Sequence, residues 1–421
     1  MDTTNNAAIP APLTDDTTYF QILIDARVSQ KPENVHFSFT ANKMSLTSTA
    51  IEGITWLSGG GKTFDDWTKP VMQLVDNSTG AKNGAKFNDT YDVTLDQLPL
   101  DPSKQYRVLK IPFLDPSNSS QSLAGSGHLT ITLDNKAVMQ INGDKTTGFS
   151  FALPSPAIDG AGGKNRWDFV EFNCATPAAN SKSVCFCDTT NVDFFSMGLT
   201  IKGRQADGTI ALFGIDLDNK IPVSSLIESL NNLSSDYTGG YLEDDNGNFL
   251  RFLAPDLSFT ATSTALDKAI NDGFSHYQNP KTPLKFTIGK TDYLATTNKN
   301  NDQLVFTQPK PFTINKPTSL EVIASTGPLN TGSTSDAEIQ DAMKFIDAAL
   351  NRGVFANTAD WSTPANWYPG GTASNDYSKA LHSAFIDSAC YGFSYDDVPG
   401  APVTSAPTIA TCTSMTLVIS E

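Results

Sequence analysis

Residues 165–174 have the sequence NRWDFVEFNC, and this stretch decides how the rest of the chain is interpreted. It is rich in aromatic and aliphatic residues, as is typical of a strand buried in a sheet. Because side chains alternate between the two faces of a strand, Trp167, Phe169 and Glu171 are expected to share one face. A carboxylate in such an apolar strand is unfavourable unless a partner or a reaction uses it. The stretch therefore predicts a strand whose glutamate has a specific role.

A second acidic residue, Asp193, lies in a similar setting in TTNVDFF, residues 189–195. If the two stretches are neighbouring strands joined by the cysteine-containing segment between them, Glu171 and Asp193 can face the same space. Hydrolysis of a glycosidic bond uses two such acids. One protonates the departing oxygen, and the other attacks the sugar or activates a water. The alternative is that both are ordinary strand carboxylates that face solvent.

The neighbours of the two acids predict different roles for them. An aromatic setting raises the pKa of a carboxyl group, so Glu171, close to Trp167, is expected to be a general acid that keeps its proton near neutrality. Asp193, beside the polar Asn191, is expected to be an ionised general base, and Asn191 is itself a candidate sugar contact. Aromatic rings stack on sugars, which makes Phe186 and Trp167 candidate walls of a sugar-binding site.

Composition and charge limit the classes of function. The chain has 421 residues, a length that favours two domains. Of these residues 39% are hydrophobic and 10% aromatic, which excludes wholesale disorder. Lys and Arg number 29 against 45 Asp and Glu, so the net charge is −16. This charge argues against nucleic acid or an anionic membrane as partner and favours a neutral substrate. No run of about 18 apolar residues is present, so no transmembrane span is expected. We expect a monomer without metal or other cofactor.

Turn residues and hydrophobic periodicity divide the chain into four segments. Residues 1–16 are polar and are expected to be a disordered lead. Residues 17–205 contain short alternating runs, which predict a β-barrel or sandwich domain that carries both acids. Residues 206–400 mix helical and strand patterns and predict an α/β domain, and residues 401–421 end in a strand that returns to the first sheet. The expected fold class is mainly β with α+β, with a binding cleft between the two domains.

Four helices and three strands are expected in the second domain. The helices are predicted at residues 222–233, 263–278, 335–353 and 377–389, and the strands at 248–254, 284–289 and 320–325. In the third helix Ser335 and Glu338 form a capping box, and Gly353 suits the position just after the helix end. His382, in the fourth helix, is expected to be a structural residue with satisfied hydrogen bonds rather than a catalytic one.

Five cysteines bear on the location of the protein. Cys174 is expected to pair with Cys185 or Cys187 and to close a hairpin, and Cys390 could form a second bridge with Cys412. Free buried thiols are the alternative for all five. The cysteines and the composition together favour a secreted, extracellular protein whose numbering belongs to a mature form.

The two acidic stretches are similar to the active-site region of glycoside hydrolase family 64, the β-1,3-glucanases with a thaumatin-like barrel. The similar segments are RWDFVEFNC (166–174) and NVDFFSMGLTI (191–201) at the acids, SGHLTITLDNKAVMQIN (126–142) before them, and AALNRGVF (348–355) and HSAFIDSACYGFSYDDV (382–398) late in the chain. The likeness covers about residues 20–420 and therefore concerns the whole chain.

This resemblance implies an inverting hydrolysis in which Glu171 is the general acid and Asp193 the general base, with their carboxyl groups ~6.5–9.5 Å apart. The family has Thr where this chain has Asn173, and Trp where it has Phe186, so both positions are expected to contact the sugar. It implies an endo-β-1,3-glucanase that acts on laminarin, curdlan or cell-wall glucan and releases short products such as pentasaccharides. The alternatives are a non-catalytic thaumatin-like glucan-binding or antifungal protein, and a structural or adhesive surface protein.

Overall fold

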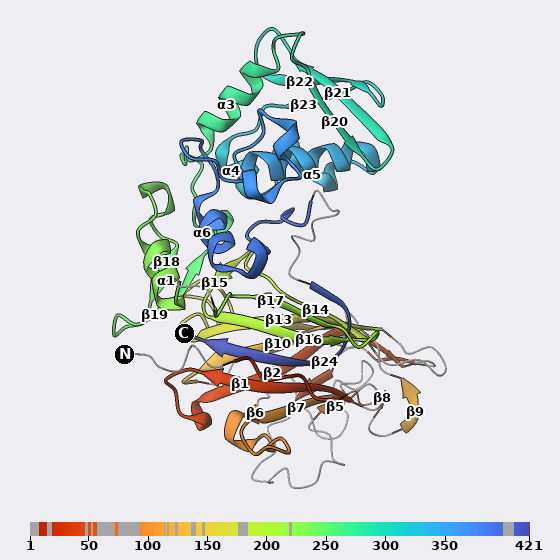
Figure 1. Cartoon of the computed structure of the whole chain (residues 1–421), viewed down its shortest axis with the longest axis vertical. Coiled ribbons are helices and arrows are strands. Elements are labelled where there is room, and N and C mark those ends of the chain that lie inside the picture. The colour runs from red at the N-terminus through yellow and green to blue at the C-terminus, as the bar shows by residue number, and fades with distance from the viewer. Residues whose placement is uncertain are drawn as a thin grey trace.

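The structure is a computed structural model. It describes residues 8–14, 19–46, 49–51, 54–56, 72–74, 93–112, 114–115, 118–122, 125–135, 140–144, 148–175, 184–218, 221–398 and 408–421. Two bodies are visible in Figure 1: a large curled sheet below, and above it a body of helices and smaller sheets. No helix in the described ranges is long and apolar enough to cross a membrane.

Among the residues that the structure describes, thirteen strands form the large sheet. They are β1 (Tyr19–Arg27), β2 (Val35–Leu46), β3 (Thr49–Ile51), β4 (Ile54–Trp56), β5 (Met72–Leu74), β6 (Val93–Thr94), β7 (Arg107–Pro112), β10 (Gly125–Leu133), β13 (Arg166–Ala175), β14 (Val184–Thr189), β16 (Gly198–Gln205), β17 (Ile210–Gly214) and β24 (Thr408–Ser420). The main path runs β17-β16-β24-β14-β13-β10-β2-β4-β5. Two separate strand pairs are β8 (Leu114–Asp115) with β9 (Asn118–Ser122), and β11 (Gln140–Asp144) with β12 (Gly148–Ala152).

The last strand, β24, curls the large sheet. One of its edges pairs with β16, while the other pairs first with β14 and then, in parallel, with β1. One strand thus joins two groups of strands, and the sheet bends into a half-barrel (Figure 1). The C-terminal strand predicted from the sequence therefore lies in the first sheet.

One face of the half-barrel is a hydrophobic core. Val170 and Phe172 of β13 lie in it, together with Leu129 and Ile131 of the neighbouring β10, and all four are at most 2% exposed. Because Glu171 lies between two core residues on β13, its side chain points to the opposite face. The alternation predicted for this strand is thus confirmed, and it turns the glutamate away from the core.

Within the described ranges, the second body contains six α-helices and two sheets. The helices are α1 (Val223–Asn231), α2 (Pro255–Ser258), α3 (Asp267–His276), α4 (Ser319–Ile323), α5 (Ala337–Asn351) and α6 (Asp376–Ala384). One sheet has the order β15 (Phe194–Phe195), β19 (Phe249–Leu253), β18 (Tyr241–Glu243), and the other the order β20 (Leu284–Ile288), β21 (Thr291–Thr297), β22 (Gln303–Gln308), β23 (Phe312–Asn315). Short 3-10 turns occur in both bodies: η1 (Pro32–Asn34), η2 (Leu95–Gln97), η3 (Ser235–Tyr237), η4 (Gly327–Leu329), η5 (Thr331–Ser333), η6 (Thr358–Asp360), η7 (Pro364–Asn366) and η8 (Ile386–Ser388).

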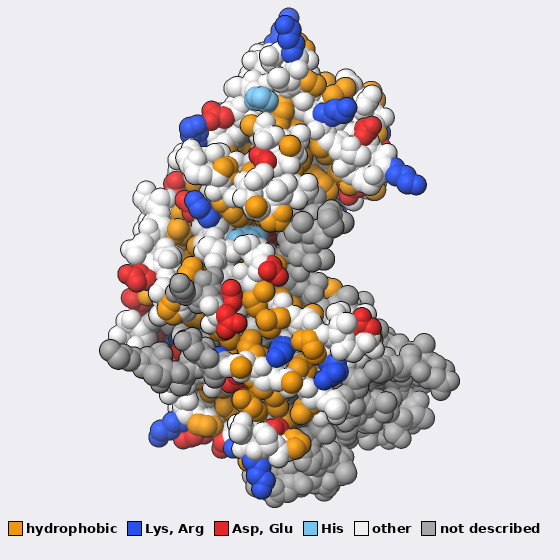
Figure 2. All heavy atoms as spheres, viewed as in Figure 1, with side chains coloured by type: hydrophobic (Ala, Val, Ile, Leu, Met, Phe, Trp, Pro, Cys, Tyr) orange, Lys and Arg blue, Asp and Glu red, His pale blue; other side chains and the backbone are white. Residues whose placement is uncertain are grey.

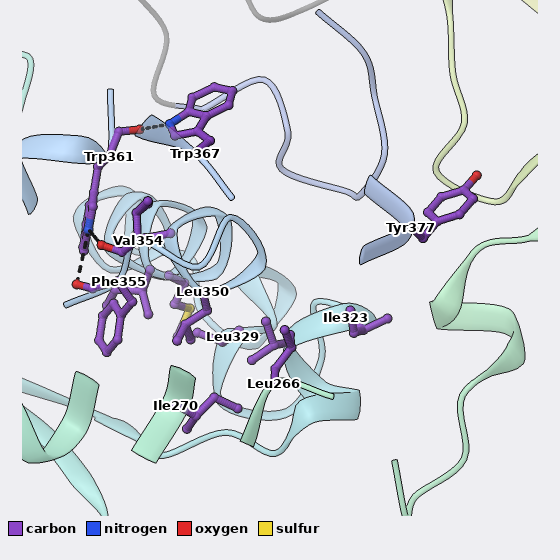
Figure 3. Packing of buried hydrophobic residues seen from close by; sticks show 14 of the residues in the cluster. Leu266, Ile270, Ile323, Leu329, Leu350, Val354, Phe355, Trp361, Trp367 and Tyr377 are labelled. Carbon is purple, nitrogen blue, oxygen red and sulfur yellow. Dashed lines mark hydrogen bonds between the residues drawn. The ribbon is translucent and has the colours of Figure 1, made fainter. Parts of the chain in front are cut away.

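A second core holds the helices and sheets of this body together. Leu266, Leu350 and Phe355 are at most 1% exposed and belong to one buried cluster, part of which Figure 3 shows. Trp361 joins them, and its indole N–H donates to the carbonyl oxygens of Val354 (3.1 Å) and Phe355 (3.3 Å). The buried indole thus keeps a polar partner, as tryptophan in a core requires.

The four predicted helices are present as α1, α3, α5 and α6. Gly353 follows the end of α5 with φ +70, as expected. The start of α5 differs from the prediction, because Asp336 and not Ser335 is the N-cap and accepts the N–H of Ile339. The strand predicted at 320–325 is wrong. Thr318 and Glu321 form a reciprocal capping box that begins helix α4 instead.

The N-terminal lead has a defined path over residues 8–14, so the prediction of disorder is wrong there. Lys202 Nζ donates to the carbonyl oxygen of Ile9 (2.9 Å), and Ser414 Oγ donates to that of Leu13 (2.7 Å). These bonds hold the lead beside β16 and β24. The remainder of the predicted lead, residues 1–7 and 15–16, lies outside the described residues.

The first sheet extends further along the chain than the sequence suggested. Strand β17 pairs with β16 and continues the large sheet to Gly214, beyond the boundary predicted at residue 205. The glycine lets the chain leave the sheet there: its φ is +105, and a Cβ would lie 2.2 Å from the carbonyl oxygen of Leu199.

The cysteines divide between one disulfide and buried thiols. Cys185 is disulfide-bonded, and its partner in the β13–β14 register is Cys174. Cys187, Cys390 and Cys412 are free and buried. The second bridge proposed between Cys390 and Cys412 is therefore wrong. These two residues lie in different surroundings, Cys390 in the core of the second body and Cys412 in the core of the half-barrel.

Candidate active site

Three titratable side chains form a row across neighbouring strands of the half-barrel. In the strand register Glu171 on β13 lies opposite His128 on β10 and, on its other side, opposite Asp188 on β14. His128 Nε2 is 3.4 Å from Glu171 Oε1. The Glu171 side chain is 42% exposed, so a molecule bound on this face of the sheet can reach its carboxyl group. The strand partner of Glu171 is thus Asp188. The sequence had suggested Asp193 in that place.

The next pair in the same register is Asn173 opposite Phe186. Both are two residues from the acidic pair along their strands, and therefore lie on the same face of the sheet. Asn173 is exposed, and the aromatic ring of Phe186 is 36% exposed although it is a large hydrophobic side chain. An amide and an uncovered ring beside two acids form a surface that suits a neutral polar polymer.

Asp193 lies in a bend between β14 and β15 rather than in a strand. Its carbonyl oxygen accepts the N–H of Ala254 (2.8 Å), just before α2 of the second body. Two residues earlier, Asn191 donates its N–H to the carbonyl oxygen of Tyr391 (2.9 Å) and accepts the hydroxyl of Tyr377 (2.7 Å) on its own carbonyl. The bend is therefore fixed by residues of the second body, and it leaves the Asp193 side chain exposed. Figure 2 shows that the molecular surface is hollowed between the two bodies.

The surroundings move the pKa values of Glu171 and Asp188 in opposite directions. A hydrogen bond from His128 lowers the pKa of Glu171 and outweighs the burial that raises it. The raised pKa expected for Glu171 from its aromatic neighbours is therefore wrong, because His128 contacts its carboxyl group. Burial, and then the negative charge of Glu171, raises the pKa of Asp188 to about 8. Opposite shifts of this kind are expected when two neighbouring carboxyl groups share one proton.

The pKa of Asp193 is raised as well, first because neighbouring protein atoms partly desolvate it and then because of the charge of Glu171. The two predicted acids therefore lie close enough to influence each other electrostatically, although they belong to different elements. A third carboxyl group, Asp256 in α2, has its pKa raised to about 7 by burial and by the charge of Asp193. Oxygen Oδ1 of Asp256 is buried without a hydrogen-bond partner.

Two of the predicted sugar contacts are buried instead. Trp167 is only 1% exposed, with its ring centroid 4.6 Å from that of Phe194 and 6.0 Å from that of Phe169. Asn191 is 4% exposed and donates its side-chain N–H to the carbonyl oxygen of Phe194 (3.3 Å). Neither side chain can meet a sugar in this structure. Both instead support Phe194, the residue that follows Asp193.

Sequence reasoning missed His128, Asp188, Asp256 and Tyr391. A signal existed for Asp188: if Cys174 pairs with Cys185, the same register places Asp188 opposite Glu171. No comparable signal existed for Asp256 and Tyr391, which reach the site only through contacts between segments far apart in the sequence. Tyr391 lies near enough to Glu171 and Asp188 for their charges to raise its pKa, which burial already raises.

One buried cluster in the described part of the chain has donor atoms of a metal site, but its bonds suit a structural role. His382, Cys390 and Asp396 lie within reach of one another. Asp396 already accepts Arg352 Nη2 (3.0 Å) and contacts His382 Nε2 (2.8 Å), while His382 Nδ1 contacts the carbonyl oxygen of Ser388 (2.6 Å). Both ring nitrogens of His382 are thus engaged, which confirms its predicted structural role.

Two interacting acids beside an exposed aromatic ring are the groups that hydrolysis of a glycosidic bond requires. The chain matches the family model described as β-1,3-glucanase, glycoside hydrolase family 64, over residues 88–419. It belongs to that family, whose members are glycoside hydrolases that act on β-1,3-glucan.

Solved structures with a similar fold are described as β-1,3-glucanases. A β-1,3-glucanase domain from Clostridium beijerinckii is 16% identical, with a TM-score of 0.63 over 97% of this chain and 99% of that one. A laminaripentaose-producing β-1,3-glucanase in complex with laminaritetraose is also 16% identical, with a TM-score of 0.66 over 96% of this chain and 98% of that one. A laminaripentaose-producing β-1,3-glucanase from Paenibacillus barengoltzii is 14% identical, with a TM-score of 0.55 over 99% of this chain and 79% of that one. No curated protein matches the chain.

Proposed function

We propose that the protein is an endo-β-1,3-glucanase that hydrolyses β-1,3-glucan with inversion at the anomeric carbon. The observation that carries this proposal is the electrostatic link between Glu171 and Asp193, in which the charge of one raises the pKa of the other. Two interacting carboxyl groups of different exposure and different partners are what acid and base catalysis at a glycosidic bond requires. Membership of the β-1,3-glucanase family supports the choice of substrate.

In the proposed mechanism Glu171 is the general acid. It protonates the departing glycosidic oxygen while Asp193, as an ionised general base, removes a proton from a water that attacks the anomeric carbon from the opposite side. The raised pKa of Asp193 suits this role, because a stronger base removes the proton of water more readily. For inversion the two carboxyl groups need a separation of ~6.5–9.5 Å, which leaves room for that water.

The substrate would lie on the face of β13 and β14 that carries the acids. Phe186 offers a ring for stacking and Asn173 an amide for hydrogen bonds, and neither requires a charged substrate. Laminarin, curdlan and cell-wall glucan are neutral polymers of this kind. Two of the similar structures are laminaripentaose-producing β-1,3-glucanases, which supports short oligosaccharides such as pentasaccharides as products.

We further propose that the protein is secreted and acts as a monomer on this polymer, without a metal. The disulfide of Cys185 supports an oxidising compartment. The net charge of −16 supports a neutral polymer rather than nucleic acid or membrane as partner. Activity should therefore persist in EDTA, and the protein should elute as a monomer from a sizing column.

The test is to incubate the protein with laminarin and, separately, with cellulose, and to follow products by chain length and by the NMR signals of their anomeric protons. The proposal requires oligosaccharides from laminarin only, released first as the α-anomer. Products released as the β-anomer would overturn inversion. Binding of laminarin without any product would instead favour a non-catalytic glucan-binding protein of the same family.

A further inference from the structure

Asp188 has no role in the mechanism above, although it is the cross-strand partner of the general acid. It is 6% exposed, and its Oδ1 atom is buried without a hydrogen-bond partner. It lies directly opposite Glu171 in the strand register, close enough for the Glu171 carboxyl group to raise its pKa. An ionised carboxylate in such a position would lack both solvent and donors, which is unfavourable unless the group carries a proton.

Glu171 has the opposite surroundings. It is more exposed, and His128 on the other neighbouring strand lies 3.4 Å from its carboxyl oxygen. Ionisation of both of two neighbouring carboxyl groups is unfavourable, because their negative charges repel. The pair therefore shares one proton, and the carboxyl group with the better hydrogen bonds carries the negative charge. In the free protein the proton therefore resides on Asp188 and the charge on Glu171. A general acid needs the reverse arrangement.

We propose that Asp188 is a positioning residue that stores the proton of the general acid and passes it to Glu171 when a glucan chain covers the site; this rests on the proposed function. Bound sugar displaces water from the more exposed Glu171, which disfavours its charge and moves the proton from Asp188 to Glu171. Glu171 then gives this proton to the departing oxygen as the bond to the anomeric carbon breaks, and Asp193 takes one proton from the attacking water. After product release the Glu171–Asp188 pair takes up one proton from solvent and Asp193 releases one.

In the described part of the chain, three other titratable groups face this pair: His128 on β10, Asp193 in the bend after β14, and Tyr391 after η8. Cys187 precedes Asp188 on β14, but its side chain lies in the core on the other face of the sheet. Burial raises the pKa values of Tyr391 and Cys187, so both stay neutral where the pair titrates. His128 and Asp193 are the groups whose charge can move the titration, and both remain in the variants used for the test.

The test compares Asp188→Asn and Asp188→Glu with the wild-type protein by measuring kcat/KM on laminarin from about pH 4 to 9. In Asp188→Asn the amide donates a hydrogen bond to Glu171 but has no proton that it can pass on. Glu171 is then ionised at lower pH than in the wild type. The basic limb of the profile should move to lower pH by at least about one unit, which lowers kcat/KM near neutrality about tenfold or more and restores it in acid. Asp188→Glu should return the limb toward its wild-type position.

Asp168→Asn is the matched control. Asp168 is a buried carboxyl on the same strand as Glu171, but it accepts backbone N–H groups of Phe169, Ser196 and Met197. Its replacement should change the melting temperature and leave the basic limb in place. If the pH profile of Asp188→Asn is unshifted, or if kcat/KM falls by the same factor at every pH, the proposal of a stored proton is overturned and Asp188 has a structural role.

A second readout separates this inference from the proposed function. The infrared difference spectrum between the wild type and Asp188→Asn, both without substrate, should contain one protonated carboxyl group that titrates near pH 8. Other buried carboxyl groups, such as Asp256 with its pKa of about 7, are present in both proteins and cancel. If that group is present but no laminarin is cleaved, the proposed function fails, and the catalytic use of the proton fails with it. If laminarin is cleaved and the group is absent, only the role of Asp188 is overturned.

Discussion

The two sides of the candidate site are built in different ways. On the acid side, His128, Glu171 and Asp188 come from three adjacent strands, and the register of one sheet places them in a row. On the base side, Asp193 lies in a bend whose backbone is bonded to Ala254. Two residues earlier, the backbone of Asn191 is bonded to Tyr377 and Tyr391. Strand register fixes one side and contacts between distant segments fix the other.

This difference has a consequence for how each acid tolerates change. A side chain in the middle of a sheet is held by hydrogen bonds of its own strand and of both neighbours. A side chain in a bend depends on the packing beneath it, here on Phe194 and the buried Trp167. The acid side should therefore respond to substitutions mainly through its pKa values, and the base side mainly through its packing.

The largest expected effects are those of Glu171→Gln and Asp193→Asn, which should each lower kcat on laminarin about 10²–10⁴-fold while glucan binding persists. A substrate with a leaving group that needs no proton, such as a laminarioligosaccharyl fluoride, should separate the two roles. Glu171→Gln should regain most of its rate on the fluoride, because the acid is then dispensable, and Asp193→Asn should not. Initial rates on both substrates give the measurement.

Asp245→Asn serves as the control for both variants, because Asp245 is an exposed acid that pairs with Lys164 (2.9 Å) and should leave both rates unchanged. Equal losses on laminarin and on the fluoride for Glu171→Gln would remove it from the role of acid. Full recovery of Asp193→Asn on the fluoride would exchange the two assignments.

The next largest effect is on stability. Trp167→Ala should lower the free energy of unfolding by about 3–5 kcal/mol, the usual cost of emptying a buried aromatic site. It also removes the ring that lies 5.6 Å below the buried guanidinium of Arg251. Urea denaturation gives the measurement, with Trp167→Phe as the milder control. If Trp167→Ala weakened glucan binding without loss of stability, the ring would be a sugar contact after all.

Much of the acid side could be predicted from sequence, because period-two alternation decides which side chains share a face. It placed Glu171 on the face opposite to Val170 and Phe172, which are core residues of β13. Phe186, chosen because aromatic rings stack on sugars, has an exposed ring. What alternation could not supply was the register, and hence His128 and Asp188. Without those two neighbours the pKa of Glu171 was expected to move in the wrong direction.

The base side was less predictable, since its geometry depends on tertiary contacts that no local pattern records. Alternation applied to TTNVDFF treated Asn191 and Asp193 as strand residues on one face, but the chain bends there and buries Asn191 while it exposes Asp193. A similar error occurred at residues 320–325, where an apolar run was interpreted as a strand although Thr318 and Glu321 begin a helix. In both places polar residues just before the apolar run redirect the backbone.

Asp256 offers a smaller, pH-dependent test of the base side. Burial raises its pKa to about 7, above the ordinary value of 3.8, so the folded protein binds this proton more tightly than the unfolded chain. The stabilisation is fully present below pH 3.8 and is lost as the pH rises through 7. Asp256→Asn should therefore melt at a higher temperature than the wild type at pH 8, with little difference at pH 4. Calorimetry at both pH values checks this, and a gain of equal size at both would contradict it.

The smallest expected effect concerns substrate binding on the acid side. Phe186 is 36% exposed and lies opposite Asn173, and stacking of its ring on a sugar is worth about 0.5–1.5 kcal/mol if it resembles other aromatic contacts. Phe186→Ala should raise KM for laminarin by roughly 2–12-fold with kcat almost unchanged, because a contact made equally in the ground and transition states affects binding alone. Phe186→Trp should bind at least as well as the wild type, since it enlarges the stacking surface. Calorimetric titration of laminarioligosaccharides into the Glu171→Gln background measures affinity without turnover. A fall in kcat for Phe186→Ala at unchanged affinity would place the ring against the reacting sugar and extend the catalytic surface one residue pair along the strands.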